Sequence, residues 1–159
     1  MRIITIPVQT LTRAAFEPYG VLLERRGTIE IDVNGGTPAM TGATSEHRPF
    51  RFSHLARHLR TMQMFSPLAG TRTIVAVARS NDFDKRDAPR LETVTAFLMD
   101  GKLPYALHRG TWHTPPFALD EWASYTVVDR AGTLEDDYEI YDFAHKDDVR
   151  FELSLEAIS

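Results

Sequence analysis

The residues best suited to chemistry in this sequence are its six histidines. Imidazole transfers protons near neutral pH, and its neutral ring binds divalent metals. The most informative pair is His108 and His113, which flank Arg109 and Gly110. A turn at Arg109-Gly110 would bring the two rings together, and Trp112 would form an apolar wall beside them. A single histidine is more often a half-buried ring bonded to a backbone carbonyl, but two around one turn favour a functional site.

A third histidine lies near a glutamine earlier in the chain. If His58 ends one strand and Gln63 begins the next, both side chains can point into one cavity. Together with His108 and His113 they would form a mixed nitrogen and oxygen site for one divalent metal. The spacing does not establish a metal, and a structural histidine at a strand end is a strong alternative.

The elements that must position these side chains are mainly strands, because the hydrophobic pattern has a period of two. Residues 28–33 alternate cleanly, with three branched aliphatic side chains on one face. Further predicted strands span residues 3–8, 21–25, 50–58, 63–66, 71–79, 92–99, 105–108, 123–129, 138–143 and 149–155. Many short strands separated by turns predict an all-β barrel or jelly roll, and the mouth of such a barrel is a common place for a small ligand.

Helices are rare in this pattern. Thr10 or Thr12 can cap one short helix that ends before Pro18. Residues 53–60 could also form a helix, but the alternation that begins at Phe50 favours a strand.

The connections carry several turn signals. Asp100-Gly101 between two predicted strands favours a tight hairpin. Residues 34–46 are small, polar and glycine-containing, which predicts a mobile loop of the length that often forms a lid. The acidic run 135–137 is read as a solvated turn, and residues 127–130 as a buried strand that ends in an ion pair or a turn.

Length and composition limit the possible functions. The 159 residues predict one domain, residues 1–159, with 43% hydrophobic residues and a net charge of −4. A mildly acidic chain without a cluster of basic residues is not expected to bind nucleic acids or anionic membranes. The absence of cysteine excludes disulfides, thiolate zinc sites and cysteine nucleophiles. The short N-terminal apolar stretch does not resemble a signal peptide, and we expect a cytoplasmic protein.

Several motifs in chain order resemble the ureidoglycolate lyase family, and the match spans nearly the whole chain. They are Phe16-Glu17-Pro18-Tyr19-Gly20, Asn34-Gly35-Gly36, Arg57-His58, Gln63-Met64-Phe65-Ser66-Pro67, Thr95-Ala96-Phe97, His108-Arg109-Gly110-Thr111-Trp112-His113 and Val127-Val128-Asp129-Arg130. The resemblance implies a cupin-like double-stranded β-barrel, or jelly roll, with one or two short helices and a homodimeric assembly. It also implies release of urea from ureidoglycolate to give glyoxylate, in allantoin and purine breakdown.

This chemistry suits the residues, because a base must take the carbinol proton and an acid must protonate the leaving nitrogen. On this resemblance His108 and His113 are the predicted catalytic residues. The candidate metal ligands, for nickel, zinc or manganese, are His58, Gln63, His108 and His113. The predicted contacts to a small carboxylate substrate are Arg48, Arg109, Gln63 and Trp112, with the carboxylate held by a divalent metal or by an arginine. No organic cofactor is expected.

Four departures from the family pattern concern this same region. Ala56 replaces a glutamate, Ala106 and Leu107 replace Asn-Tyr, and Thr114 replaces a histidine. These changes predict a wider and less polar pocket, and leave open the same elimination on a related α-hydroxy acid. They also leave open another metal-dependent cupin reaction, such as isomerisation or dioxygenation of a small carboxylate, or a cupin that only binds its ligand. Residues 149–155 are one candidate dimer surface.

Overall fold

The computed structural model describes residues 1–84 and 86–159, and its regular secondary structure consists mainly of strands in two sheets. The nine-stranded sheet has the order β13 (Glu139–Asp142), β5 (His54–Arg57), β10 (Trp112–His113), β7 (Thr73–Ala78), β8 (Thr95–Met99), β1 (Arg2–Thr10), β14 (Val149–Ser154) and β4 (Arg51–Phe52), with β11 (Phe117–Ala118) also on β7. The five-stranded sheet has the order β2 (Gly20–Leu22), β9 (Tyr105–Leu107), β6 (Gln63–Pro67), β12 (Trp122–Arg130) and β3 (Pro38–Glu46).

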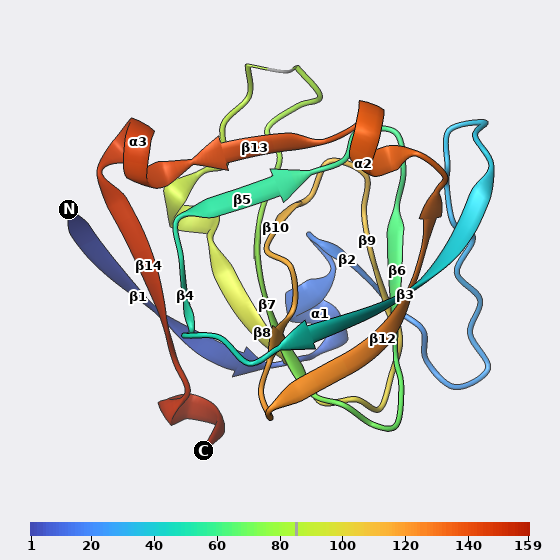
Figure 1. Ribbon diagram of the computed structural model, residues 1–159, viewed down its shortest axis with the longest axis horizontal. Helices are drawn as coiled ribbons and strands as arrows, with labels where there is room; N and C mark the ends of the chain where they lie inside the picture. Colours follow the sequence, from blue (N-terminus) through green and yellow to red (C-terminus); the bar gives the residue numbers. More distant parts are fainter. Residues whose placement is uncertain (85) are drawn as a thin grey trace.

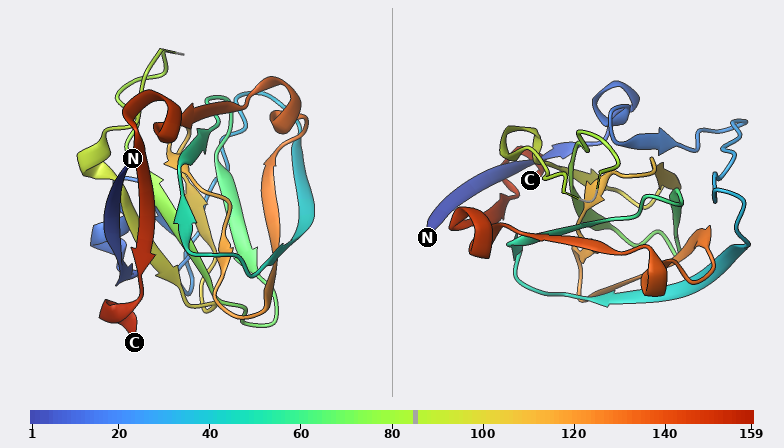
Figure 2. Two further views of the ribbon diagram at one scale, coloured as in Figure 1. Left: turned by 60° about the vertical axis from the view of Figure 1, so that its left-hand side comes forward. Right: turned by 90° about the horizontal axis from the view of Figure 1, so that it is seen from above.

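Short helices occupy only the connections. They are α1 (Arg13–Phe16), α2 (Thr133–Asp136) and α3 (Phe143–Asp147), with 3₁₀ turns η1 (Leu91–Thr93) and η2 (Glu156–Ile158). Figure 1 shows β5 and β13 across the top of the molecule and β3 and β12 across its front. In the left view of Figure 2, β3 and β12 lie on one side and β1 and β14 on the other. The expected cupin-like double-stranded barrel is confirmed.

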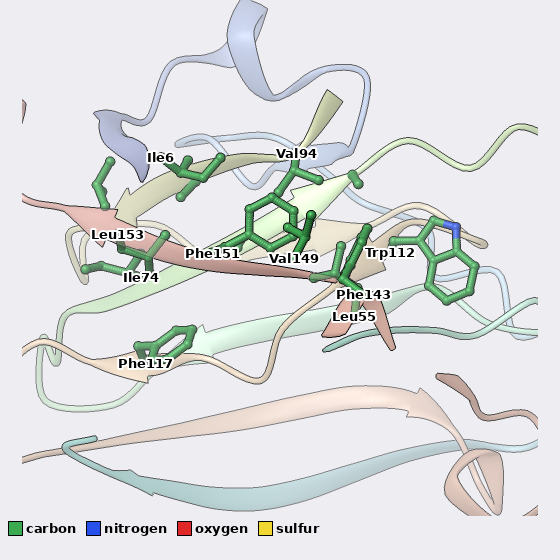
Figure 3. Close-up of a cluster of buried hydrophobic side chains, with 14 residues drawn as sticks. Ile6, Leu55, Ile74, Val94, Trp112, Phe117, Phe143, Val149, Phe151 and Leu153 are labelled. Atoms are coloured by element: carbon green, nitrogen blue, oxygen red, sulfur yellow. The ribbon is translucent and has the colours of Figure 1, made fainter. Parts of the chain in front are cut away.

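Strand β7 separates two hydrophobic cores. All six of its residues are buried, so both of its faces are covered. Ile74, Ala76 and Ala78 pack into the first core, which also holds Trp112 and Phe117 (Figure 3). On the opposite face Val75 and Val77 pack into the second core, between the two sheets. A continuous apolar strand is the expected pattern for an element buried on both faces.

The start of the chain is held by one close approach. Thr12 caps α1 by accepting a hydrogen bond from the backbone N–H of Ala15, so Thr12 is the cap of the two candidates. Helix α1 places Phe16 in the second core beside Gly20. A Cβ atom at Gly20 would lie 2.1 Å from the carbonyl oxygen of Ala106, so this position requires glycine. This close approach explains why the motif of residues 16–20 ends in glycine.

Two predictions for residues 28–46 are wrong. Residues 28–33 alternate in exposure as expected, yet they form no ladder within the described chain. The predicted mobile loop is instead mostly a strand, because residues 38–46 form β3 and pair with all nine residues of β12. Its alanines and threonines fit a pleated edge strand, and they lack the large apolar side chains that a hydrophobic pattern detects.

One turn and one strand also differ from expectation. The Asp100-Gly101 turn, with Gly101 at φ +83°, leads from β8 in one sheet to β9 in the other, so it closes no hairpin. The segment 149–155 is an interior strand, because β14 pairs with β1 on one side and with β4 on the other. Its edge is therefore partly occupied by β4, at Phe151 and Glu152. The prediction of a strand at residues 50–58 is confirmed, with a break at Ser53 between β4 and β5.

Candidate functional site

A cavity of about 600 Å³ lies between the two sheets. Strands β3, β6 and β12 contribute one wall, and β5, β10 and the two prolines after β10 contribute another. Most of the lining is apolar, including Phe65, Tyr125 and Val127. The polar groups that reach it include His58, Gln63, His113, Asp129 and Arg130. A mostly apolar hollow with a few convergent polar groups is typical of a small-molecule site.

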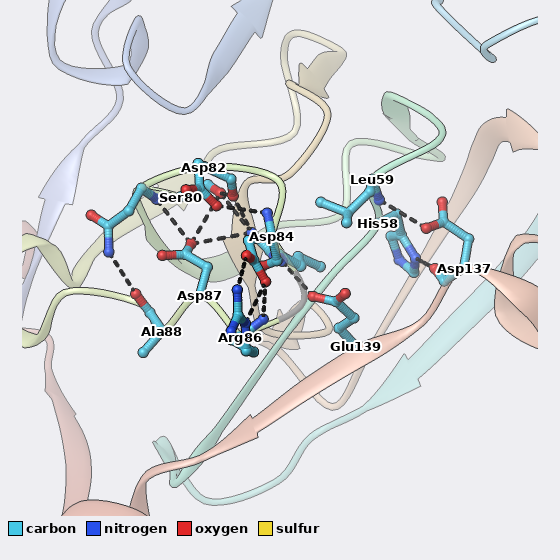
Figure 4. A network of polar contacts seen from close by, with 12 residues as sticks. His58, Leu59, Ser80, Asp82, Asp84, Arg86, Asp87, Ala88, Asp137 and Glu139 are labelled. Carbon is cyan, nitrogen blue, oxygen red and sulfur yellow. Dashed lines mark hydrogen bonds and ion pairs between the residues drawn. The ribbon is translucent and has the colours of Figure 1, made fainter.

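His58 follows the end of β5 and is almost fully buried. Its Nδ1 lies 2.6 Å from the carbonyl oxygen of Asp137, and this nitrogen must be the donor because a carbonyl only accepts. The carboxylate of Asp137 accepts the backbone N–H groups of Leu59 and Arg60 at 2.9 and 2.8 Å (Figure 4). Asp137 therefore fixes both the ring and the turn that follows it. The neutral ring is left with a free electron pair on Nε2.

His113 uses the same arrangement on the neighbouring strand. Its Nδ1 donates to the carbonyl oxygen of Thr111 at 2.9 Å. The centres of the His58 and His113 rings are 5.4 Å apart. Burial, followed by the charge of His58, lowers the pKa of His113 from its ordinary value to about 3. At neutral pH the His113 ring is uncharged and its Nε2 is an acceptor.

Gln63 is the third buried polar group of the cavity. Its Nε2 donates to the carboxylate of Asp129 at 2.8 Å, which fixes the orientation of the amide because a carboxylate cannot donate. The amide oxygen Oε1 is buried and has no partner among the described residues. An unpaired buried acceptor is costly, and it is expected to receive a ligand, an ordered water or a cation.

Positive charge at the cavity is already matched. Arg130 makes two hydrogen bonds of 2.7 Å to the carboxylate of Asp136 in α2. This confirms the ion pair expected after β12. The described lining contains no other arginine and no lysine.

The expected meeting of His108 with His113 does not occur. Residues 108–111 carry the chain from β9 in one sheet to β10 in the other, so His108 lies at the end of one sheet and His113 lies within the other. The exposed His108 ring places its Nε2 3.0 Å from the carbonyl oxygen of Glu17. It lines a separate surface hollow together with Arg79 and Arg109.

Three other predicted contact residues also lie outside the cavity. Arg109 donates to the carbonyl oxygen of Leu59 and pairs with Asp32. Trp112 is buried in the first core, because neighbouring residues on a strand face opposite sides. Arg48 donates to the carbonyl oxygens of Pro115 and Pro116 and lies in a neighbouring hollow. Of the predicted site residues, the structure brings together His58, Gln63 and His113.

The expected four-ligand metal site is not assembled. Within residues 1–84 and 86–159, no group of three or more histidine, cysteine, aspartate or glutamate side chains is arranged to hold a metal ion. Three groups of the cavity nevertheless fit a cation. In its neutral form each imidazole presents an unprotonated Nε2 with Nδ1 bonded to a carbonyl, which is the usual arrangement of ligating histidines. The unpaired Oε1 of Gln63 adds an oxygen donor.

Comparison with known proteins gives a consistent family assignment. The family model described as "Ureidoglycolate lyase" matches residues 38–150. The chain belongs to the ureidoglycolate lyase family. Among its relatives, the ureidoglycolate lyase of Burkholderia mallei (strain NCTC 10229) is 32% identical over 148 residues, covering 80% of this chain and 84% of that protein. The ureidoglycolate lyase of Azotobacter vinelandii is 32% identical over 152 residues, covering 83% and 87%.

A solved structure with a related outline is RmlC from Streptococcus suis in complex with dTDP-D-xylose. It is 12% identical, with a TM-score of 0.46, and the match covers 76% of this chain and 62% of that one. No described helix is long and apolar enough to cross a membrane.

The departures from the ureidoglycolate lyase pattern have different structural consequences. Ala56 lines the cavity and stands opposite His113 in the ladder, so the missing glutamate leaves space beside the imidazoles. Ala106 and Leu107 are buried in β9 and do not line the cavity. The Thr114 hydroxyl accepts the backbone N–H of Ala76 at 3.1 Å, which joins the chain after β10 to β7. Only the change at Ala56 therefore alters the lining.

Sequence analysis missed two residues of the site. Asp137 was expected in a solvated turn, yet it is buried and holds His58. Asp129 was assigned only to a strand end, yet it orients Gln63. No local pattern marks either role, since their partners lie 79 and 66 residues away in the chain. The recurrence of Val127-Val128-Asp129-Arg130 in the family motif was the one available signal for Asp129.

Proposed function

We propose that this protein releases urea from ureidoglycolate and forms glyoxylate. The observation that carries the proposal is membership of the ureidoglycolate lyase family over most of the chain. The cavity supports it, since it holds two paired imidazoles and a buried amide oxygen without a partner. Elimination of urea requires one proton to move from the carbinol oxygen to the departing nitrogen, with no net oxidation.

His58 is the residue best placed to move this proton. Its Nδ1 is held by Asp137, and the free Nε2 can accept the carbinol proton while the carbon–oxygen double bond forms. As the carbon–nitrogen bond breaks, the same Nε2 returns the proton to the urea nitrogen, so the balance closes. His113 is a poor base, because its pKa is about 3. It serves as an acceptor or a ligand.

The substrate carboxylate needs a positive partner, and Arg130 is already paired with Asp136. We propose that a divalent metal held by His113 and Gln63, which leaves Nε2 of His58 free, supplies that charge. When bound, nickel, zinc or manganese would also polarise the hydroxyl group.

The test measures urea and glyoxylate release from ureidoglycolate by the purified protein. Three preparations are compared: untreated, chelated, and chelated with nickel, zinc or manganese added back. We expect release that falls on chelation and returns with one metal. Release that is unchanged by chelation would support the lyase reaction and contradict a role for the metal. If no preparation releases urea, the proposed reaction is wrong for this chain, and Ala56 is the first position to restore, as Ala56→Glu.

We further propose that the enzyme works in the cytoplasm as a homodimer, in the breakdown of allantoin and purines. The free edge of β3 supports a dimer, because within the described chain this strand pairs only with β12. Its residues Ala39–Ser45 carry no charge, and long uncharged edges tend to pair with another strand. Light scattering coupled to size exclusion should report twice the chain mass, and Thr44→Pro should shift it to the monomer. A monomeric parent protein would contradict this.

A further inference from the structure

A second hollow, of about 430 Å³, lies beside the cavity, behind the prolines that follow β10. Its walls come from the residues before β4, from β4 itself, from β14 and from the segment that precedes β11. Three arginines line it: Arg48, Arg51 and Arg150. Pro115 lines both hollows, so the two are separated by a single stretch of backbone.

Arg48 brings a fixed positive charge to this hollow. Its guanidinium donates to the carbonyl oxygens of Pro115 and Pro116 at 2.9 and 3.0 Å and stacks over the ring of Phe117 at 3.8 Å. These partners hold the group in place without neutralising it, and no ion pair to Arg48 is present among the described residues. Burial lowers the pKa of Arg48 from its ordinary value. Two of its five N–H groups are used, which leaves donors for a ligand.

Arg150 and Arg51 come from adjacent strands. Arg51 stands opposite Glu152 in the ladder between β4 and β14, and Glu152 is bonded to Arg150 at 3.1 Å. The Nε of Arg150 is buried and has no partner in residues 1–84 and 86–159. Arg51 forms no ion pair with a described residue. The three guanidinium groups thus have one nearby carboxylate, that of Glu152. A second carboxylate, that of Asp142, pairs with His54 at the rim of the hollow.

We propose that this hollow binds a small oxyanion, a carboxylate or a phosphate, at a site distinct from the cavity of His58 and His113. Guanidinium groups recognise carboxylate and phosphate through paired, charge-assisted hydrogen bonds. A bound oxyanion would pair the free Nε of Arg150 and balance the excess charge. The site does not depend on the reaction proposed above.

The experiment titrates inorganic phosphate and glyoxylate separately into the intact protein by calorimetry. Ionic strength is held constant with chloride, so that general screening is equal in all titrations. We expect saturable binding of at least one of the two probes. Stronger binding of phosphate would identify a phosphate site, and stronger binding of glyoxylate a carboxylate site.

Five variants locate the binding. Arg51→Gln and Arg150→Gln should each weaken it about tenfold, a loss of about 1.4 kcal/mol. Glu152→Gln should strengthen it, because it removes the competing carboxylate, an effect that a general loss of stability cannot produce. Arg13→Gln, an exposed arginine in α1, is the control and should change nothing. The proposal is overturned if neither probe saturates, if both arginine variants bind normally, or if binding disappears only in His58→Ala.

Discussion

Two imidazole rings with the same hydrogen-bonding pattern face one cavity, but their surroundings give them different chemistry. Each ring donates from Nδ1 to a backbone carbonyl, which leaves Nε2 unprotonated in the neutral form. His113 is so deeply buried that its pKa falls to about 3. His58 is buried as well, but its ring is held by Asp137 and stacks against Tyr138, a half-exposed residue at the rim. The proton-transfer role is therefore assigned to His58.

This assignment predicts opposite outcomes for two histidine variants. His58→Ala should lower kcat for urea release at least a hundredfold, because general acid–base catalysis contributes about 10²–10⁴. His108→Ala should keep most of the activity, since His108 lies in a separate hollow. Thermal midpoints measured alongside show whether each variant is folded. If His108→Ala alone abolished turnover, the expectation drawn from its motif would be right and the cavity would not be the active site.

The buried His113 also predicts an acid-sensitive fold. In the unfolded chain this histidine binds a proton below about pH 6.5, whereas in the fold it stays neutral down to about pH 3. The unfolded state binds more protons between these values, so stability falls as the pH falls. Between pH 7 and pH 5 the loss from His113 is about 2 kcal/mol.

Urea unfolding at both pH values, with a chelator present to remove metal, measures this loss. His113→Gln cannot take up the proton, and its stability should therefore vary less with pH than that of the parent protein. Equal pH dependence in both proteins would show that His113 does not control the acid sensitivity.

At the scale of elements, a buried arginine ties β5 to the long connection after β7. Arg57 is fully buried, and its Nε donates to Glu139 of β13 at 2.6 Å. Its other nitrogens bond the side chains of Ser80 and Asp87 and the carbonyl oxygens of Asp82 and Asp84. Figure 4 shows Ser80, Asp82, Asp84 and Asp87 close together, with Glu139 to one side of them. Because Arg57 precedes His58, the network also anchors the strand end that carries the proposed base.

Removal of this arginine should be costly. Arg57→Met keeps much of the side-chain volume but leaves Glu139 and Asp87 without their buried counter-charge and removes one donor from each of two carbonyl oxygens. Loss of one partner from a buried ion pair costs about 3–5 kcal/mol, and we expect a loss of this size in urea unfolding. The matched control is Arg72→Met, whose ion pair with Asp120 is exposed and should cost less than about 1 kcal/mol. Similar losses in both variants would mean that the buried network adds no stability.

At the scale of the whole molecule, the two cores share the wall formed by β7 and β8. Alternate residues of β7 belong to different cores, so neither core can lose its packing while the other stays covered. We therefore expect the chain to unfold as one domain, in a single cooperative transition.

Two optical probes test this cooperativity. Trp112 is buried in the first core and Trp122 is exposed, so fluorescence of a Trp122→Phe variant reports the first core alone. Near-ultraviolet circular dichroism of the same variant adds the signals of the tyrosines, three of which, Tyr19, Tyr105 and Tyr125, lie in the second core. Coincident unfolding curves are expected. Separated midpoints would indicate two units that unfold independently.

Local patterns were sufficient for most strands, because a half-buried strand repeats its apolar side chains every second residue. They failed for β3, whose small residues carry no such signal, and for residues 28–33, which alternate without a pairing partner. Motif order was sufficient for the family. His58, Gln63 and His113 were also identified from the sequence, since each stands at or beside a strand end.

The amino-acid sequence by itself determined the all-β class, the family and three of the cavity residues. Only the tertiary structure decided which side each histidine faces and which distant groups complete the site. A change of sheet between β9 and β10 moves His108 away from His113, although they are five residues apart. Packing also brings Asp137 to His58 and Asp129 to Gln63, which are 79 and 66 residues apart in the chain. Periodicity reports the direction of a side chain within its own strand, whereas a site depends on which strands become neighbours.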